Sequence, residues 1–255
     1  MKLVSASAEV TVDLKAGGRL SSFRLHGEEI LVSSTSDPFG WGCYPMIPWA
    51  GRIRDGKFDW EGREIALPVN MEPHAIHGTL YNSPWTQVED MAAQSHFAAP
   101  WAFSGHAKSR FELGDNHFIW ALEVHTESEN MPCVVGWHPW FIRDKNIRSD
   151  DAFSFSPETM YERDESGIPT GQKIKPSPRP WDDCFENDRG PINLRCAGNQ
   201  RLEISSDCSH WVIYDEPEHA FCIEPQSAPP NGFNLGAFTV VTPERPLIRN
   251  MIWRW

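Results

Sequence analysis

The chain of 255 residues lacks paired cysteines, long apolar runs and an excess of basic side chains. Its six cysteines form no C-x-x-C pair, which disfavours both a disulfide framework and a thiolate zinc site. We therefore expect most of them to be buried, reduced thiols. The cysteines are Cys43, Cys133, Cys184, Cys196, Cys208 and Cys222.

Charge and hydropathy exclude two kinds of partner. A formal net charge of −12 argues against nucleic acid or an anionic membrane surface as the main partner. No segment is long and apolar enough to span a bilayer, and Glu9 and Asp13 come before any apolar core of secretory length. We expect a cytoplasmic protein, and the sequence leaves open whether it is a monomer or a homodimer.

The sequence also lacks long segments with helical periodicity, and it contains short segments typical of β-strands instead. Runs rich in β-branched or aromatic residues alternate with glycine turns, which predicts an all-β fold, and 58–65 predicts a hairpin. The 21 prolines and 18 glycines mark no linker, so we expect one domain over residues 1–255. The expected strands are Ala8–Leu14, Arg19–Leu25, Lys57–Leu67, His117–His125, Arg201–Ser205, Trp211–Tyr214, Ala220–Ile223 and Ala237–Val241.

The segment Ser166–Pro180 holds several prolines and glycines and no apolar alternation. We expect a long irregular loop there, and loops of that length in compact domains often border functional sites.

Glu224 is the most informative single residue, because it ends an apolar run and precedes a proline-rich stretch. We expect Ala220–Ile223 to be a buried strand and the prolines that follow Glu224 to restrict the loop after it. That combination suits a carboxylate whose position matters.

His138 lies in Gly136-Trp137-His138-Pro139-Trp140-Phe141, between aromatic residues. One interpretation is a core histidine satisfied by a backbone carbonyl. The other is a proton donor whose ring is oriented by its aromatic neighbours. The motif alone favours neither.

Arg52 follows Gly51 in Trp49-Ala50-Gly51-Arg52-Ile53-Arg54-Asp55-Gly56. A planar guanidinium can hold two neighbouring sugar hydroxyls or a carboxylate, and a structural ion pair is the alternative. We expect Arg54 to be solvated or paired with Asp55.

Two further motifs carry candidate ligands. His74 and His77 are three positions apart, but no third ligand or H-E-x-x-H pattern accompanies them, so we predict no metal site. Asp182 and Asp183 are adjacent, and in a strand their side chains would point to opposite faces, so that at most one enters a given cleft. The 12 tryptophans suit a carbohydrate cleft, although most should be core residues.

The order of these motifs resembles the aldose 1-epimerase, or galactose mutarotase-like, family and its compact bacterial branch. The resemblance rests on Trp49 to Phe58, His74 to Gly78, Gly136 to Phe141 and Glu224-Pro225-Gln226. It implies a large twisted β-sandwich with a sugar cleft, which interconverts the α and β anomers of a free aldose without a cofactor.

The resemblance also implies a role for each matching residue. Glu224 matches the general base that takes the proton of the C1 hydroxyl, and His138 matches the general acid that protonates the ring oxygen. Arg52 and His77 match substrate-binding positions. Asp182 aligns with a hydroxyl-binding aspartate, although a slip of one residue would substitute Asp183. Gly232, in Asn231-Gly232-Phe233-Asn234, stands where many relatives have a small apolar residue.

Three alternatives remain open at this stage. A hexose-6-phosphate 1-epimerase would need cations for the phosphate, for which the candidates are Arg52, Arg54, Arg143 and Lys145. A non-catalytic sugar-binding protein could have the same fold. A glycoside hydrolase would use Glu224 with Asp182 or Asp183.

Overall fold

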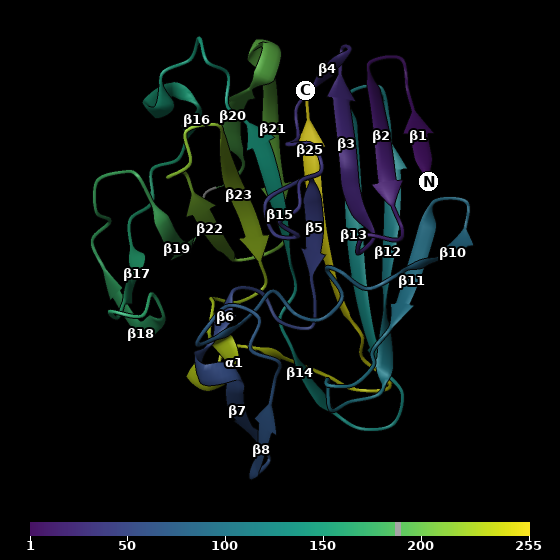
Figure 1. Ribbon diagram of the computed structural model, residues 1–255, viewed down its shortest axis with the longest axis vertical. Helices are drawn as coiled ribbons and strands as arrows, with labels where there is room; N and C mark the ends of the chain where they lie inside the picture. Colours follow the sequence, from purple (N-terminus) through teal and green to yellow (C-terminus); the bar gives the residue numbers. More distant parts are fainter. Residues whose placement is uncertain (187–189) are drawn as a thin grey trace.

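The computed structural model describes residues 1–186 and 190–255 and is built almost entirely of β-strands (Figure 1). Two large antiparallel sheets, of 11 and 8 strands, form a twisted β-sandwich. The all-β sandwich expected from the sequence is therefore confirmed.

The larger sheet carries most of the residues singled out above. Across it, in order, are β1 (Lys2–Val4), β2 (Ala8–Asp13), β3 (Arg19–Leu25), β5 (Cys43–Met46), β15 (Gly136–Ile142), β23 (Ala220–Gln226), β22 (His210–Tyr214), β19 (Asp182–Glu186), β17 (Met160–Arg163) and β18 (Pro169–Ile174), with β4 (Glu28–Glu29) paired to β3.

The second sheet covers the core from the other side, and three strand pairs complete the fold. The second sheet runs β10 (Thr86–Glu89), β11 (Ala92–His96), β12 (Gly105–Leu113), β13 (His117–Thr126), β25 (Leu247–Arg254), β21 (Gln200–Ser206), β20 (Ile192–Cys196) and β16 (Phe153–Ser154). The pairs are β14 (Met131–Cys133) with β24 (Thr239–Val241), β6 (Arg52–Ile53) with β9 (Ala75–Ile76), and β7 (Lys57–Trp60) with β8 (Arg63–Ala66). The helical elements are η1 (Arg54–Gly56), η2 (Ser149–Asp151), η3 (Ala197–Asn199) and α1 (Gly232–Leu235).

The core forms because alternate residues of strands such as β2 and β13 point between the sheets. Buried and less buried residues alternate along β2 and along β13, as a half-buried strand requires. Phe23 of the larger sheet packs edge-on against Phe118 of the second sheet and contacts Trp253, with ring centroids 5.5 and 5.0 Å apart. Each such aromatic side chain buries a large apolar area, so these contacts hold the two sheets together.

The three central strands are buried on both faces. In β5 and β23 every residue is buried, and β15 is buried over all but its last residue. Polar residues in these strands are therefore withdrawn from solvent. The expected end of the strand at Ile223 was too early, because β23 continues through Glu224 and Pro225 to Gln226. Glu224 thus lies within a strand in the middle of the sheet, and the loop begins after it.

The other expected strands agree with the structure, with one shortened. The segment 57–67 forms the β7–β8 hairpin, and 237–241 is a strand only from Thr239. The long irregular loop expected over Ser166–Pro180 was wrong in part, because β18 occupies Pro169–Ile174 and pairs with β17. This strand has mostly exposed residues, so it lacks the apolar alternation that marks a strand in sequence.

One end of the sandwich gathers the small elements. Figure 1 shows β6, α1 and the β7–β8 hairpin together at the bottom of the view, and the β17–β18 hairpin at the left edge. In the described ranges, no helix is long and apolar enough to cross a membrane. All six cysteines are buried and free, as expected.

Candidate active site

A cavity of about 390 Å³ lies over the centre of the larger sheet. Its walls come from β5, β15, β23, β22 and β19, and from the segments that contain Arg52 and His77. All five candidate residues line it: Arg52, His77, His138, Asp182 and Glu224. The topology thus brings together residues that are up to 172 positions apart.

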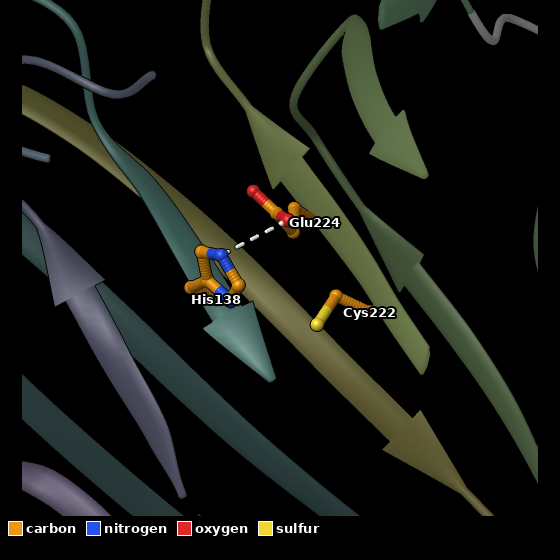
Figure 2. Close-up of side chains that lie close together, drawn as sticks. All are labelled: His138, Cys222 and Glu224. Carbon is orange, nitrogen blue, oxygen red and sulfur yellow. Dashed lines mark ion pairs between the residues drawn. The ribbon is translucent and has the colours of Figure 1, made fainter. Parts of the chain in front are cut away.

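His138 and Glu224 form the centre of the site. The register that pairs Gly136 with Gln226 and Trp140 with Cys222 places His138 level with Glu224 on the neighbouring strand. Nε2 of His138 lies 3.2 Å from Oε1 of Glu224 (Figure 2). Both side chains are buried, with 7% and 2% of their area exposed. The pair is close enough to share a proton.

Burial sets the protonation of this pair. It raises the pKa of Glu224 well above its ordinary value, and the nearby Asp182 adds to that shift. Burial also lowers the pKa of His138 to about 3, against a smaller opposing contribution from the residue's own backbone carbonyl. Both shifts favour neutral side chains. The form of the pair that burial favours therefore has its shared proton on the carboxyl group and a neutral imidazole.

Gln226 fixes the second oxygen of the carboxyl group. Its Nε2 donates to Oε2 of Glu224 over 3.2 Å, which leaves Oε1 for His138. Two residues apart on one strand, the two side chains share a face of β23.

Cys222 makes the same strand a conceivable metal site. A nitrogen of His138, the sulfur of Cys222 and an oxygen of Glu224 lie within 4.8 Å of one another. Figure 2 shows the three side chains together. Burial raises the pKa of the Cys222 thiol well above its ordinary value. Because metals bind the thiolate and not the thiol, this donor set is poorly suited to a metal.

His77 reaches the cavity through a tight bend. Both His77 and Gly78 have positive φ, of 60° and 76°. A Cβ at position 78 would lie 1.9 Å from the carbonyl oxygen of Ile47, so only glycine fits there. The His77 ring meets that of His138 edge to face at 5.0 Å. Burial holds the pKa of His77 well below its ordinary value, so it is a neutral hydrogen-bonding group.

Two arginines and two aspartates form the polar wall of the cavity. Nη1 of Arg52 lies 3.7 Å from Oδ2 of Asp182, and Nη1 of Arg163 lies 3.3 Å from the same oxygen. Nε of Arg163 also lies 2.8 Å from Oδ1 of Asp183. Burial raises the pKa of both aspartates, which the arginines oppose.

The expectation that only one of the two aspartates enters the cleft was wrong. Asp182 is the first residue of β19, Arg163 bridges its carboxylate to that of Asp183, and both residues line the cavity. Asp182 is the more available of the two, because 27% of its side chain is exposed against 6% for Asp183.

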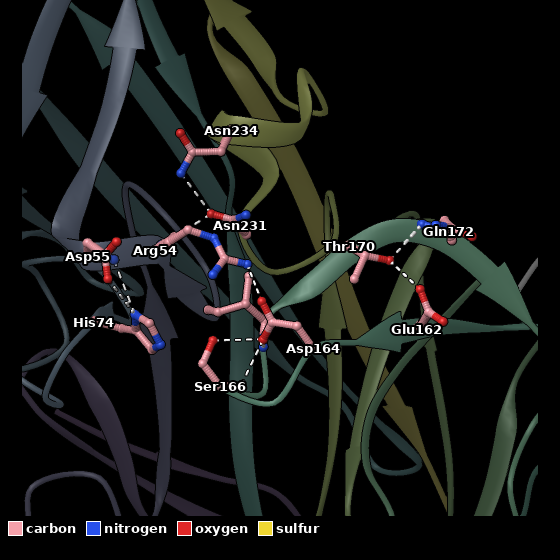
Figure 3. A network of polar contacts seen from close by, with 11 residues as sticks. Arg54, Asp55, His74, Glu162, Asp164, Ser166, Thr170, Gln172, Asn231 and Asn234 are labelled. Atoms are coloured by element: carbon pink, nitrogen blue, oxygen red, sulfur yellow. Dashed lines mark hydrogen bonds and ion pairs between the residues drawn. The ribbon is translucent and has the colours of Figure 1, made fainter.

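Arg54 connects two segments that border the cavity, those of Arg52 and Gly167. It pairs with Asp164 in the β17–β18 turn, not with Asp55 as one expectation had it (Figure 3). Its backbone N–H donates to Oδ1 of Asn231 over 3.1 Å, and the N–H of Asn231 donates to the carbonyl of Arg52 over 2.6 Å. The segment that carries Arg52 is thus tied to the loop after β23.

Some of the remaining residues line the cavity and others do not. His74 does not line the cavity; its Nδ1 accepts the backbone N–H of Asp55 over 3.1 Å, so it does not act with His77. All tryptophans except Trp255 are buried, and Trp140 lines the cavity. Sequence reasoning gave no role to Tyr44, Arg163 or Gln226, which also line it. Gln226 had a usable signal, since it shares a strand face with Glu224 in Glu224-Pro225-Gln226.

Comparison with known proteins assigns the class of protein. The family model described as aldose 1-epimerase matches residues 5–243. The chain therefore belongs to the aldose 1-epimerase family, a class of carbohydrate epimerases, as its motifs led us to expect.

Individual relatives are distant. The Escherichia coli (strain K12) protein YihR is 27% identical over 224 residues, which cover 75% of this chain and 71% of that protein. The structure of the aldose epimerase homologue from C. elegans covers 100% of this chain and 97% of its own, with 14% identity and a TM-score of 0.81. That of galactose 1-epimerase from Lactobacillus acidophilus NCFM covers 99% and 92%, with 18% identity and a TM-score of 0.77. These likenesses establish the galactose mutarotase-like fold.

Proposed function

We propose that this protein interconverts the α and β anomers of a free, uncharged aldose by acid–base ring opening. The observation that carries the proposal is the buried His138–Glu224 pair at 3.2 Å inside a polar cavity. Membership of the aldose 1-epimerase family supports it. The reaction transfers protons and breaks and re-forms one C–O bond without net oxidation or reduction, so the proposed mechanism uses no cofactor.

In the proposed reaction the pair transfers two protons. The single proton first moves from Glu224 to His138 across their contact, and this charged form is stabilised by Arg52, whose charge favours the Glu224 carboxylate. The carboxylate then takes the proton of the C1 hydroxyl, C1 becomes a carbonyl, and the C1–O5 bond breaks. The electron pair stays on O5, which takes the proton from His138.

Ring opening leaves the pair in its neutral form, which burial favours. Rotation about the C1–C2 bond presents the other face of the aldehyde, and the reverse proton transfers close the ring as the other anomer. In this proposal Arg52, His77 and Asp182 bind hydroxyl groups of the sugar, and Asp182 also holds Arg52 in place.

The charges of the cavity favour a neutral sugar over a hexose 6-phosphate. Among the described residues, the cationic side chains that line the cavity are Arg52 and Arg163, and both face Asp182. Arg143 and Lys145, considered above for a phosphate, line a separate cavity. A phosphate would therefore meet no free cation at the site.

Polarimetry of freshly dissolved sugars tests the proposal. We expect the wild-type protein to accelerate mutarotation of α-D-glucose or α-D-galactose above the spontaneous rate, and to act at least about tenfold less efficiently on the 6-phosphates. His138→Asn should reduce turnover by at least about a hundredfold, the usual scale for loss of a positioned acid. Acceleration limited to phosphorylated sugars would refute the substrate class, and normal turnover by His138→Asn would refute the role of the histidine.

A further inference from the structure

A column of stacked planar groups crosses the floor of the site. At one end, the guanidinium carbon of Arg19 lies 4.1 Å from the ring centroid of Trp41 and 4.9 Å from that of Tyr44. The column continues through rings, with centroid distances of 4.8 Å from Tyr44 to His138 and 5.5 Å from His138 to Trp140. It ends at His219, whose ring centroid is 6.3 Å from that of Trp140. The last three ring pairs lie within 22°, 16° and 12° of parallel. His138 is in the middle of the column.

The column is fixed at one end by Arg19. This side chain is fully buried, and its guanidinium donates hydrogen bonds of 2.7 to 3.2 Å to four backbone carbonyls. Tyr44 is fully buried between Arg19 and His138, and β5 places it directly opposite His138 in the register with β15. Tyr44 therefore has little freedom to move, and its ring presents a fixed face to the imidazole.

His138 needs such a support because, among the described residues, polar contacts with other side chains hold only the Nε2 side of its ring. Nε2 contacts Glu224, but Nδ1 has no hydrogen-bond partner in another residue among those described. A catalytic histidine is commonly oriented by a bond to its second nitrogen. Without that bond, the broad torsion about the Cβ–Cγ bond lets the ring rotate away from Glu224.

We propose that Tyr44 is a positioning residue, whose ring face holds the plane of the His138 imidazole so that Nε2 points at Glu224. This inference rests on the proposed function for its consequence in turnover, but not for the ring contact itself. The hydroxyl of Tyr44 is buried and has no hydrogen-bond partner among the described residues, so no hydrogen bond from it fixes the ring. The ring, and not the hydroxyl, carries the proposed role.

Three variants separate these contributions. Tyr44→Phe keeps the ring and removes the hydroxyl, whereas Tyr44→Met fills similar space without a flat face. Tyr161→Met is the matched control, since Tyr161 is also buried beside a histidine, His210, but does not line the cavity. For each variant, kcat and KM come from polarimetry with α-D-galactose and α-D-glucose.

The second measurement does not depend on activity. Ring-nitrogen NMR of ¹⁵N-histidine protein reports the tautomer of His138, whose signals are assigned by their loss in His138→Asn. We expect one tautomer in wild type and Tyr44→Phe, and signals displaced toward the tautomer average in Tyr44→Met. We expect kcat to fall roughly three- to tenfold in Tyr44→Met, which corresponds to the interaction energy of one aromatic pair, with KM nearly unchanged. Tyr44→Phe and Tyr161→Met should both have a kcat near that of wild type.

Two results would overturn the inference. One is His138 signals and kcat in Tyr44→Met that match wild type; the other is a loss in Tyr44→Phe as large as in Tyr44→Met, which would assign the role to the hydroxyl. If Tyr44→Met does not fold, Tyr44→Leu replaces it, and the Tyr44→Phe result still decides between ring and hydroxyl. If wild type does not catalyse mutarotation, the NMR comparison decides alone, so failure of the proposed function is recognised separately.

Discussion

At the scale of single residues, Glu224 is where function and stability conflict. Its carboxyl group is buried on a central strand, and besides the contact with His138 its described side-chain hydrogen bond comes from the amide of Gln226. An ionised carboxylate in such a place is costly, which is why burial raises its pKa. The proposed reaction therefore needs a glutamate at a position where the neutral amide of glutamine would make the fold more stable.

We predict that Glu224→Gln stabilises the fold, and more so as the pH rises. Below about pH 4.5 the glutamate is protonated in both folded and unfolded protein, so the variant and the wild type differ little. Above that pH the unfolded chain loses the proton first, and wild type loses about 1.4 kcal/mol of unfolding free energy per pH unit until the folded pKa is reached.

Urea unfolding at pH 4 and pH 8 measures this difference, with Glu216→Gln at the exposed rim of the cavity as the control. A gap between Glu224→Gln and wild type that is the same at both pH values would contradict the raised pKa.

Residues that line the cavity were predictable only where they lie in contiguous motifs. His138 and Glu224 each stand out within a few positions of sequence. Arg163 does not, because it acts on Asp182 and Asp183 from a different strand, and nothing near it in sequence indicates a partner. Tyr44 was hidden for another reason, since a buried aromatic in a strand is typical of any core.

At the scale of elements, the site depends on how loops are tied to the sheet. Asn231 has a φ of 62°, a region that asparagine tolerates better than most residues. Its side-chain oxygen accepts the N–H of Arg54 and the side-chain amide of Asn234, and its own N–H donates to the carbonyl of Arg52 (Figure 3). It therefore links the loop after β23 to β6 and η1.

We predict that Asn231→Ala raises KM several-fold and lowers the unfolding free energy by about 1–3 kcal/mol. The Arg54 N–H would lose its acceptor, and the positive φ would be strained. Asn231→Asp keeps the acceptor and should lie closer to wild type. Polarimetry and urea unfolding measure both effects, and an unchanged KM in Asn231→Ala would show that this link does not position Arg52.

The strands could be predicted where one face is apolar, and not elsewhere. Alternation in 8–14 and 117–125 gave β2 and β13 almost to the residue. The edge strand β18 has no apolar face, and the end of β23 contains Glu224 and Pro225, which normally mark the end of a strand. Tertiary burial, and not local sequence, decides these cases.

At the scale of the whole molecule, the two sheets share one hydrophobic core. The cluster contains side chains from both sheets, including Phe23, Phe141 and Trp253. Separation of the two sheets would expose the apolar inner faces of both at once. We therefore predict that residues 1–255 unfold in one cooperative transition.

Calorimetry tests this prediction by comparing the calorimetric enthalpy with the van't Hoff enthalpy. Equal values are expected for a single unit. Two resolved transitions would show that the chain contains two independently stable parts.

Which strands are neighbours in the sheets could not be predicted from the sequence. The family resemblance implied the sandwich, but the pairing of β15 with β23 brings together His138 and Glu224, which are 86 positions apart. The two prolines that flank this contact, Pro139 and Pro225, would argue locally against a central strand. They nevertheless lie within β15 and β23, opposite Cys43 and Trp211 in the neighbouring strands.

The central claim is that the His138–Glu224 pair opens and closes the ring of a free aldose. The most direct test is polarimetry of α-D-glucose and α-D-galactose with wild type and Glu224→Gln in parallel, after subtraction of the spontaneous rate. We predict acceleration by wild type and a loss of at least about a hundredfold in the folded variant. Equal acceleration by both proteins, or none by wild type, would contradict the claim.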